Sequence, residues 1–219
     1  HLFPVAAIAS GLLLQARCWS SDQQVSEQKI REAPKVLRAS EVGVGRLVRD
    51  FPLTTLAGKQ LRLTDFSTYD GVVIAMTGTG CPLCKKYAPT LANLEKIYQK
   101  KNIAFIFINP NTSEAIADLQ KEARRLGLSG PYVRDGSRNI CGHLDVKTTT
   151  EVFVLDRSRT LIYRGAVDDQ HGFGYSLEEP RNRYLQNALD ALIGERRPLV
   201  AATSAPGCEL LYDHKLAPA

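Results

Sequence analysis

Two cysteines separated by two residues, Cys81 and Cys84, are the part of this sequence best suited to chemistry. Two thiols at this spacing can form a disulfide that opens and closes, and so exchange with a disulfide of another molecule. The first thiol attacks when its pKa is low, and the second can then attack the mixed disulfide and release the partner. We therefore predict a redox centre with Cys81 as nucleophile and Cys84 as resolving thiol.

The flanking residues predict the elements that hold this pair. Residues 71–76 form a short, apolar, β-prone run, as in a buried strand, and residues 85–100 carry apolar side chains at helical spacing. The cysteines therefore stand where a strand leads into a helix. Unpaired N–H groups and the helix dipole at that end favour a thiolate. We expect Cys81 to be exposed and Cys84, one turn later, to be less so.

Two other interpretations of the pair are possible. Half of a zinc site would need two further ligands, and the nearest are Cys141 with His143, or the distant Cys208, at spacings unlike those of known zinc sites. A permanent structural disulfide is the other alternative. The redox interpretation is favoured, and it requires neither a metal nor a cofactor.

Composition narrows the class of protein. The chain has 219 residues, of which 44% are hydrophobic, enough for one domain with a sizeable core. Its formal net charge is +5, but the basic residues are scattered among acidic ones and no nucleic-acid-binding motif accompanies them. We expect no nucleic-acid partner.

The first twenty residues differ from the rest. Residues 2–16 are almost wholly apolar, too short a run for a membrane span of roughly twenty residues but suited to the core of a secretory signal. Cys18 suggests a lipid anchor, although Arg17 precedes it where a small residue is expected. We predict an exported protein, periplasmic or in the cell envelope, with membrane contact only through this segment.

The remaining sequence predicts an alternation of strands and helices. The expected elements are a hairpin at 51–63, strands at 71–76, 102–109 and 132–133, helices at 82–100 and 113–126, a helical turn at 137–144, paired strands at 151–156 and 160–165, and a helix at 181–193. A Gly-rich polar loop spans 168–180. This order predicts an α/β fold about a central mixed sheet. The expected domains are a signal-like segment 1–20, a polar linker 21–41, a domain 42–195 and a surface tail 196–219.

The stretch from Cys81 to Pro89 resembles the thioredoxin pattern C-x-x-C-K-x-x-x-P, and residues 51–63 are similar to the opening of exported redoxin domains. The chain is identified as a member of the thioredoxin superfamily, in its redoxin branch, over residues 42–195. The resemblance implies an α/β thioredoxin-like three-layer sandwich with an added N-terminal hairpin. It also implies a thiol–disulfide oxidoreductase acting on protein or small-molecule disulfides, with protein thiol and disulfide partners in the cell envelope.

The sequence departs from thioredoxin around the cysteines. Gly80 stands where thioredoxin has a Trp, and Ala75 stands at the position of its buried carboxylate. Thr79, Gly80 and Pro82 are expected to shape the substrate surface and to tune the pKa of Cys81.

A second departure is that Thr150 occupies the position of the family's cis-proline. A cis bond before a residue other than proline costs about 2.5–4 kcal/mol, so the Thr149–Thr150 bond is predicted to be trans. A trans loop would bring Thr149 or Thr150 to the nucleophile. We predict that Thr150 contacts the Cys81 sulfur and helps to set its pKa.

Two alternative functions follow from the same residues. A peroxiredoxin-like peroxidase would need P-x-x-x-T-x-x-C, but Ile74 and Gly78 stand at the Pro and Thr positions, and no Arg is placed to hold a peroxide. Copper binding or delivery would need a histidine near the cysteines, and His143 and His171 are distant in sequence.

Two further cysteines could take part in redox chemistry. Cys208 lies in the tail and could fold back over the active site as an alternative resolving thiol, pair with Cys141, or be passive.

Overall fold

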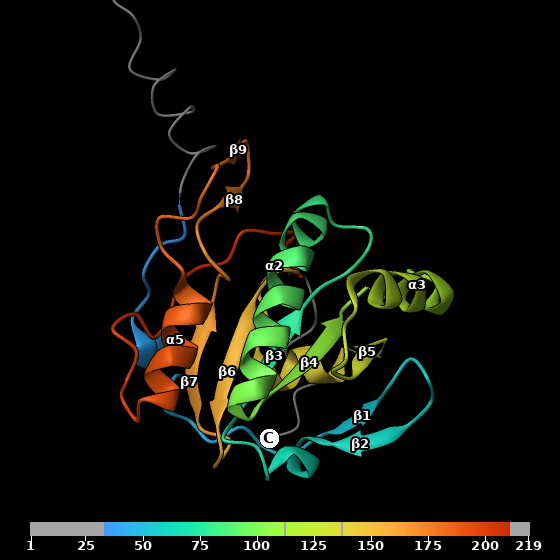
Figure 1. Ribbon diagram of the computed structural model, residues 1–219, viewed down its shortest axis with the longest axis horizontal. Coiled ribbons are helices and arrows are strands. Elements are labelled where there is room, and N and C mark those ends of the chain that lie inside the picture. The colour runs from blue at the N-terminus through green and yellow to red at the C-terminus, as the bar shows by residue number, and fades with distance from the viewer. Residues whose placement is uncertain (1–32, 112, 137, 211–219) are drawn as a thin grey trace, which may run out of the picture.

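The computed structural model describes residues 33–210 except 112 and 137, and a five-stranded sheet forms its centre (Figure 1). β3 pairs in parallel with β4 and antiparallel with β6, so the sheet is mixed, as predicted. The strands in spatial order are β5 (Tyr132–Arg134), β4 (Ile103–Asn109), β3 (Gly71–Met76), β6 (Val152–Asp156) and β7 (Leu161–Gly165).

Helices cover both faces of this sheet and complete three layers. One face packs against α2 (Pro82–Tyr98), α3 (Ile116–Leu126) and α5 (Tyr184–Ile193). The other face packs against α4 (Asn139–Leu144) and the segment around Phe51. In Figure 1, α2 and α5 run side by side in front of the sheet. The thioredoxin-like sandwich predicted from the sequence is confirmed.

The side chains of β3 alternate between the two hydrophobic clusters on opposite faces of the sheet. Val73 and Ala75 belong to the cluster under α2 and α5, whereas Val72, Ile74 and Met76 belong to the cluster under α4. Successive side chains of a strand point to opposite faces, so an uninterrupted apolar run is needed where both faces are covered.

The predicted N-terminal hairpin is present as β1 (Pro52–Thr54) and β2 (Gln60–Arg62), paired antiparallel. Gly58, with φ of 81°, lies in the turn between them. The remaining short elements are η1 (Ala39–Val42), η2 (Leu63–Phe66), η3 (Gln99–Lys101), β8 (His171–Gly172) and β9 (Tyr175–Ser176). The last two form a small hairpin inside the predicted Gly-rich polar loop.

Helix α3 begins at Ile116, later than the predicted Ser113. Ser113 does not cap the helix, because its N–H and hydroxyl both donate to the side chain of Asn111. The intervening Glu114 points its carboxylate toward residues 79–80. The segment before α3 is thus held by the loop next to the cysteines.

The tail is not confined to the surface, contrary to the prediction. Ala202 and Thr203 are 1% and 2% exposed, and the Leu37 N–H donates to the Ala202 carbonyl. Gly165 explains the close approach, because a Cβ at this residue would lie 2.2 Å from the Thr203 hydroxyl oxygen. Residues 201–203 of the tail are therefore packed against β7.

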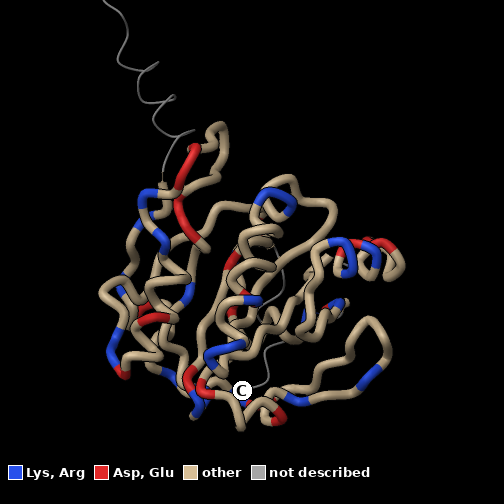
Figure 2. Tube along the Cα trace, viewed as in Figure 1, with Lys and Arg blue, Asp and Glu red and all other residues tan. Residues whose placement is uncertain are grey.

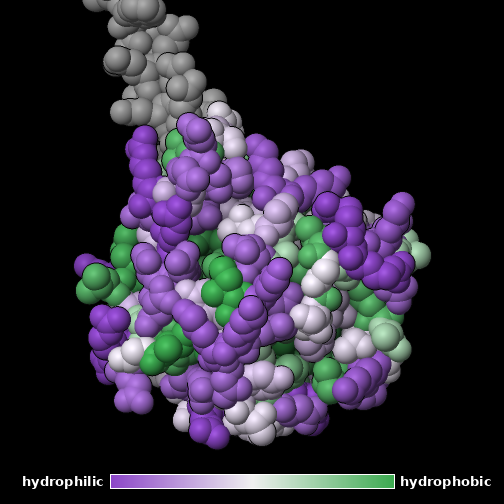
Figure 3. Space-filling view, in the orientation of Figure 1, coloured by the Kyte–Doolittle hydropathy of each residue, from purple (hydrophilic) through white to green (hydrophobic). Residues whose placement is uncertain are grey.

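The surface carries interspersed charges. In Figure 2 acidic and basic residues alternate over the molecule, and in Figure 3 hydrophobic residues on the visible face form small, separate groups. None of the helices within residues 33–210 is long and apolar enough to cross a membrane. The predicted signal-like segment 1–20 lies outside the described residues.

Candidate active site

Cys81 lies at the start of α2, where the strand β3 and its following loop lead into the helix. It is the N-cap residue, and Pro82 occupies the first turn. The Cys84 N–H points at the Cys81 Sγ over 3.5 Å, so the sulfur takes the place of a capping oxygen. Cys81 is 8% exposed and Cys84 2%. The predicted order of exposure holds, but Cys81 is far less open than expected.

The loop before β6 meets both cysteines. The Thr149 hydroxyl donates to the Cys81 Sγ over 3.3 Å, and the Cys84 thiol donates to the Thr149 carbonyl over 3.0 Å. No peptide bond within the described residues is cis, so the bond between Thr149 and Thr150 is trans, as predicted. The prediction that Thr150 contacts the Cys81 sulfur is wrong, because the neighbouring Thr149 makes this contact. The Thr150 hydroxyl donates to the Pro206 carbonyl instead.

These contacts shift the pKa values of the two thiols in opposite directions. The side chain of Cys84 lowers the pKa of Cys81 most, and the Thr149 hydroxyl lowers it further. Together they outweigh burial, which raises the pKa, and bring it to about 4. The same pairing with Cys81, together with burial, raises the pKa of Cys84 far above its ordinary value. At neutral pH one thiolate therefore stands beside one thiol.

The loop before Cys81 is held by Glu114, a residue that sequence reasoning missed. Its carboxylate accepts from the N–H and hydroxyl of Thr79, at 2.7 and 2.6 Å, and from the Gly80 N–H at 3.0 Å. Burial raises its pKa, but these hydrogen bonds outweigh burial and hold the pKa below its usual value. Asn109 and Asn111 also donate to Glu114. No sequence motif marks Glu114, because its role depends on β3 and β4 being neighbours.

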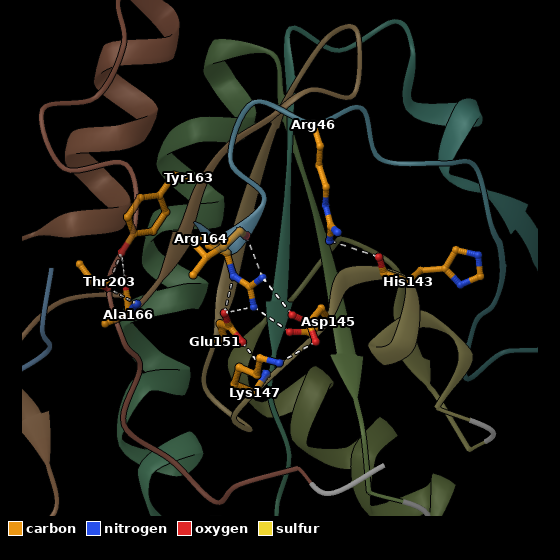
Figure 4. Close-up of polar contacts among 10 residues, drawn as sticks. Arg46, His143, Asp145, Lys147, Glu151, Tyr163, Arg164, Ala166 and Thr203 are labelled. Atoms are coloured by element: carbon orange, nitrogen blue, oxygen red, sulfur yellow. Dashed lines mark hydrogen bonds and ion pairs between the residues drawn. The ribbon is translucent and has the colours of Figure 1, made fainter. Parts of the chain in front are cut away.

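A buried ion pair fixes the far end of the Thr149 loop (Figure 4). Glu151 Oε1 accepts from Arg164 Nε at 2.8 Å and from Nη2 at 2.6 Å, and both side chains are at most 5% exposed. Arg164 also donates to the carbonyls of Asp145 and Val42. One β7 side chain thus ties together the two ends of the loop that carries Thr149.

A pocket of about 240 Å³ opens at the cysteines. Besides Cys81, Cys84, Gly80 and Thr149, the residues lining it include Glu114, Arg138, Cys208 and Leu210. The Cys208 Sγ lies 3.9 Å from the Cys81 Sγ. The tail therefore covers the nucleophile, which explains why Cys81 is mostly buried.

With this geometry in view, comparison with known proteins decides the family. The sequence model of the family Redoxin matches residues 43–180, more than half of the chain. The chain belongs to the Redoxin family. The superfamily and branch inferred from the CxxC motif and hairpin are thereby confirmed.

Relatives of this redoxin are thiol-disulfide oxidoreductases. The thiol-disulfide oxidoreductase ResA of Geobacillus thermodenitrificans is 32% identical over 117 residues, which are 53% of this redoxin and 66% of ResA. The match thus spans just under two thirds of the relative's length.

Solved structures agree in fold. An uncharacterized conserved protein of Geobacillus kaustophilus is 25% identical, with a TM-score of 0.72 over 78% of this redoxin and 93% of that chain. Peroxidoxin BcpB of Mycobacterium tuberculosis is 20% identical, with a TM-score of 0.54 over 71% of this redoxin and 99% of that chain. The second likeness shows the fold alone.

Cys141, predicted as a possible redox thiol, is separated from the active site of this redoxin. It lies on α4, is 0% exposed and packs into the core between that helix and the sheet. Burial, followed by the nearby Asp135 carboxylate, raises its pKa. A thiol in this environment is protonated and inaccessible, so the structure does not favour its pairing with Cys208.

The histidines considered for copper lie apart from the cysteine pocket. The His143 ring lies tilted against Phe51, and its Nδ1 hydrogen-bonds with the Asn139 carbonyl, while His171 lies against Tyr87 and Ser176. No cluster of three or more His, Cys, Asp or Glu side chains suited to a metal ion occurs among residues 33–210 as described.

Proposed function

We propose that this redoxin is a thiol–disulfide oxidoreductase in which Cys81 attacks and Cys84 resolves. The observation that carries the proposal is a Cys81 sulfur at the N-cap of α2, with a lowered pKa, beside a Cys84 thiol whose pKa is raised. The ResA relatives share the reaction class that this geometry suits.

The reaction runs through one mixed disulfide. The Cys81 thiolate attacks one sulfur of a partner disulfide, forming a bond to it while the other partner sulfur leaves as a thiolate. The Cys84 thiol then gives up its proton and attacks the Cys81 sulfur. The bond between Cys81 and the partner breaks, the second partner sulfur leaves as a thiol, and Cys81–Cys84 is oxidised by two electrons. The reverse sequence oxidises a dithiol.

Thr149 assists both steps by position. Its hydroxyl holds the Cys81 thiolate before attack, and its carbonyl orients the Cys84 thiol. Thr79, Gly80 and Pro82 complete the surface around the sulfur, with Glu114 fixing the loop that carries the first two.

Differential alkylation tests the assignment. After a brief pulse of reagent on the reduced protein at pH 6, Cys81 should be labelled and Cys84 spared, and mild oxidation should protect both against the reagent until a reductant is added. Faster labelling of Cys84 than of Cys81 would reverse the roles. Failure to form a reversible Cys81–Cys84 bond would remove the proposal.

We further propose that the protein is exported and works on protein thiols and disulfides of the cell envelope. The apolar run at residues 2–16 and a redox-active cysteine pair support this location. Fractionation of cells expressing the full-length gene product tests it. Recovery of the protein in the cytoplasm with an intact N-terminus would contradict it.

Peroxidase activity is the second candidate, because Arg138 lines the same pocket as Cys81. An Arg beside a thiolate can hold a peroxide oxygen. Consumption of hydrogen peroxide in the presence of a thiol reductant, lost in Arg138→Lys and in Cys81→Ser, would support it. Slow consumption that is unchanged by Arg138→Lys would eliminate it.

A further inference from the structure

Residues 207–210 of the tail lie along the Thr149 loop as an added strand. The Thr149 N–H donates to the Cys208 carbonyl over 3.0 Å, and the Leu210 N–H donates to the Lys147 carbonyl over 2.9 Å. Thr148 and Glu209 face each other as an antiparallel bridge. Main-chain pairing of this kind is how a sheet edge or loop receives an extended peptide.

The tail is closely fitted to this position. Gly207 has φ of 146°, and a Cβ there would lie 3.1 Å from the hydroxyl oxygens of both Thr149 and Thr150. Only glycine adopts this backbone conformation without strain and leaves room for both hydroxyls. The Thr150 hydroxyl donates to the Pro206 carbonyl just before it. The residues around the tail are therefore matched to a Gly-Cys segment.

The pairing presents Cys208 to the nucleophile. Its Sγ is 3.9 Å from the Cys81 Sγ, and its N–H donates to the Thr149 hydroxyl oxygen over 3.1 Å. A disulfide needs the two sulfurs at about 2.0 Å, which is within reach of an exposed side chain that can rotate. Desolvation, followed by the Cys81 thiolate, raises the pKa of Cys208, so it is a thiol while Cys81 is reduced.

We propose that Cys208 is a third exchanging thiol which bonds Cys81 in place of Cys84, and that residues 207–210 of the chain itself occupy the position at the Thr149 loop that an extended partner segment must take. The inference rests on the proposed function and goes beyond it in making the tail a competitor of the partner.

The exchange of the Cys81–Cys84 disulfide for a Cys81–Cys208 disulfide needs no outside oxidant. When Cys81–Cys84 is a disulfide, the Cys208 thiol loses its proton and its sulfur attacks the Cys81 sulfur. The Cys81–Cys208 bond forms as the Cys81–Cys84 bond breaks, and the leaving Cys84 sulfur takes up one proton. One disulfide replaces another, with no net oxidation.

The first test uses the full chain with Cys84→Ser, and with Cys84→Ser and Cys208→Ser together. Oxidised glutathione should attach to Cys81 in both variants. In the single variant Cys208 should then expel glutathione and leave a Cys81–Cys208 disulfide, mapped by mass spectrometry of peptides. In the double variant the glutathione adduct should persist. Equal persistence in both variants would overturn the role of Cys208.

Failure of this inference is distinguishable from failure of the proposed function. The function is read in the wild-type protein as a reversible Cys81–Cys84 disulfide. A wild-type Cys81–Cys84 bond without closure to Cys208 in the single variant removes only the inference. Closure to Cys208 without a wild-type Cys81–Cys84 bond removes the proposed function instead.

The strand pairing is tested by a matched pair of prolines in the Cys84→Ser background. Leu210→Pro removes the N–H that bonds Lys147, whereas Glu209→Pro alters a residue whose N–H the antiparallel pattern turns away from the loop. Loss of one hydrogen bond should slow expulsion of glutathione by Cys208 about five-fold in Leu210→Pro relative to Glu209→Pro. Equal rates, with equal melting temperatures, would overturn the pairing.

The same prolines in the otherwise wild-type chain test the partner site. Loosening the tail should let an extended peptide carrying a mixed disulfide react faster with Leu210→Pro than with Glu209→Pro. A small disulfide, which needs no main-chain pairing, should show a smaller difference between the two. Identical peptide rates in the two variants would show that the tail does not occupy the partner's position.

Discussion

The hydroxyl of Thr149 donates a hydrogen bond to the Cys81 Sγ over 3.3 Å. The same oxygen accepts the Cys208 N–H at 3.1 Å. A hydroxyl has a single hydrogen, so the bond accepted from Cys208 helps to direct that hydrogen at the sulfur. The tail thereby affects the nucleophile through Thr149 as well as by covering it.

Replacing Thr149 by Val should weaken this thiolate. Hydrogen bonds to charged groups contribute about 1.5–3 kcal/mol, so the pKa of Cys81 should rise measurably in Thr149→Val. The absorbance of the thiolate near 240 nm, followed against pH, measures it. Thr150→Val is the matched control, since its hydroxyl bonds Pro206 and not the sulfur. An unchanged titration in Thr149→Val would contradict the assignment.

The reduced protein should become more stable as the pH rises. The folded-state pKa of Cys81 is about 4, below the ordinary value of about 9, so between these values the unfolded state binds more protons than the folded state. The stabilisation is full above about pH 9 and is lost as the pH falls toward 4. Thermal unfolding of reduced wild type and Cys81→Ser across this window measures it, and the two curves should converge at the acid end.

Removing the Glu114 carboxylate should loosen the loop that leads to Cys81. Glu114→Ala leaves the Thr79 and Gly80 donors without their acceptor, at a cost of about 1–3 kcal/mol in unfolding free energy and with slower disulfide exchange. Urea unfolding and an exchange assay measure the two effects. Asp118→Ala, at an exposed residue in the first turn of α3, just after Glu114, serves as control. Equal behaviour of the two variants would argue against the anchoring role.

The buried pair of Arg164 and Glu151 should be costly to break from one side. Arg164→Met leaves a carboxylate 4% exposed without its partner and should destabilise by about 3–5 kcal/mol. Adding Glu151→Gln removes the uncompensated charge and should recover part of the loss. Urea unfolding of the single and double variants decides it. A double variant less stable than Arg164→Met would show that charge is not the cause.

Cys141 should be inert in the folded protein. Its thiol is fully buried with a raised pKa, so alkylating reagents should modify it only after unfolding. Disulfide exchange by Cys141→Ala should match that of wild type. Labelling of Cys141 in increasing urea should begin only where the protein unfolds globally. Rapid labelling of the native protein would contradict the prediction.

Much of the fold follows from local patterns. The apolar run of β3 and the helical spacing after Pro82 are signals within one segment, so both elements and the position of Cys81 could be predicted. The start of α3 could not, because Ser113 is an ordinary capping residue by type and the preference of its side chain for Asn111 arises only in the folded loop.

The cysteine chemistry of the site could be predicted from the sequence, but the residues that surround the cysteines could not. Thr149 and Thr150 are equivalent in sequence, and only the direction of the chain through the loop decides which hydroxyl meets Cys81. Glu114 and Arg138 reach the pocket from loops that the parallel order of β3, β4 and β5 brings together. The described tail was predicted to lie on the surface from its Pro and Ala content, yet its main-chain hydrogen bonds and glycines place it in the site.

The pairing of residues separated by 127 positions also gives the active site an order of assembly. A ribosome releases β3, α2 and both catalytic cysteines well before it reaches Gly207, and domains begin to fold as their residues emerge. A nascent chain stopped before residue 207 therefore carries Cys81 and Cys84 without the strand that covers them. During synthesis we therefore expect the nucleophile to be open first and to be covered only when residues 207–210 arrive.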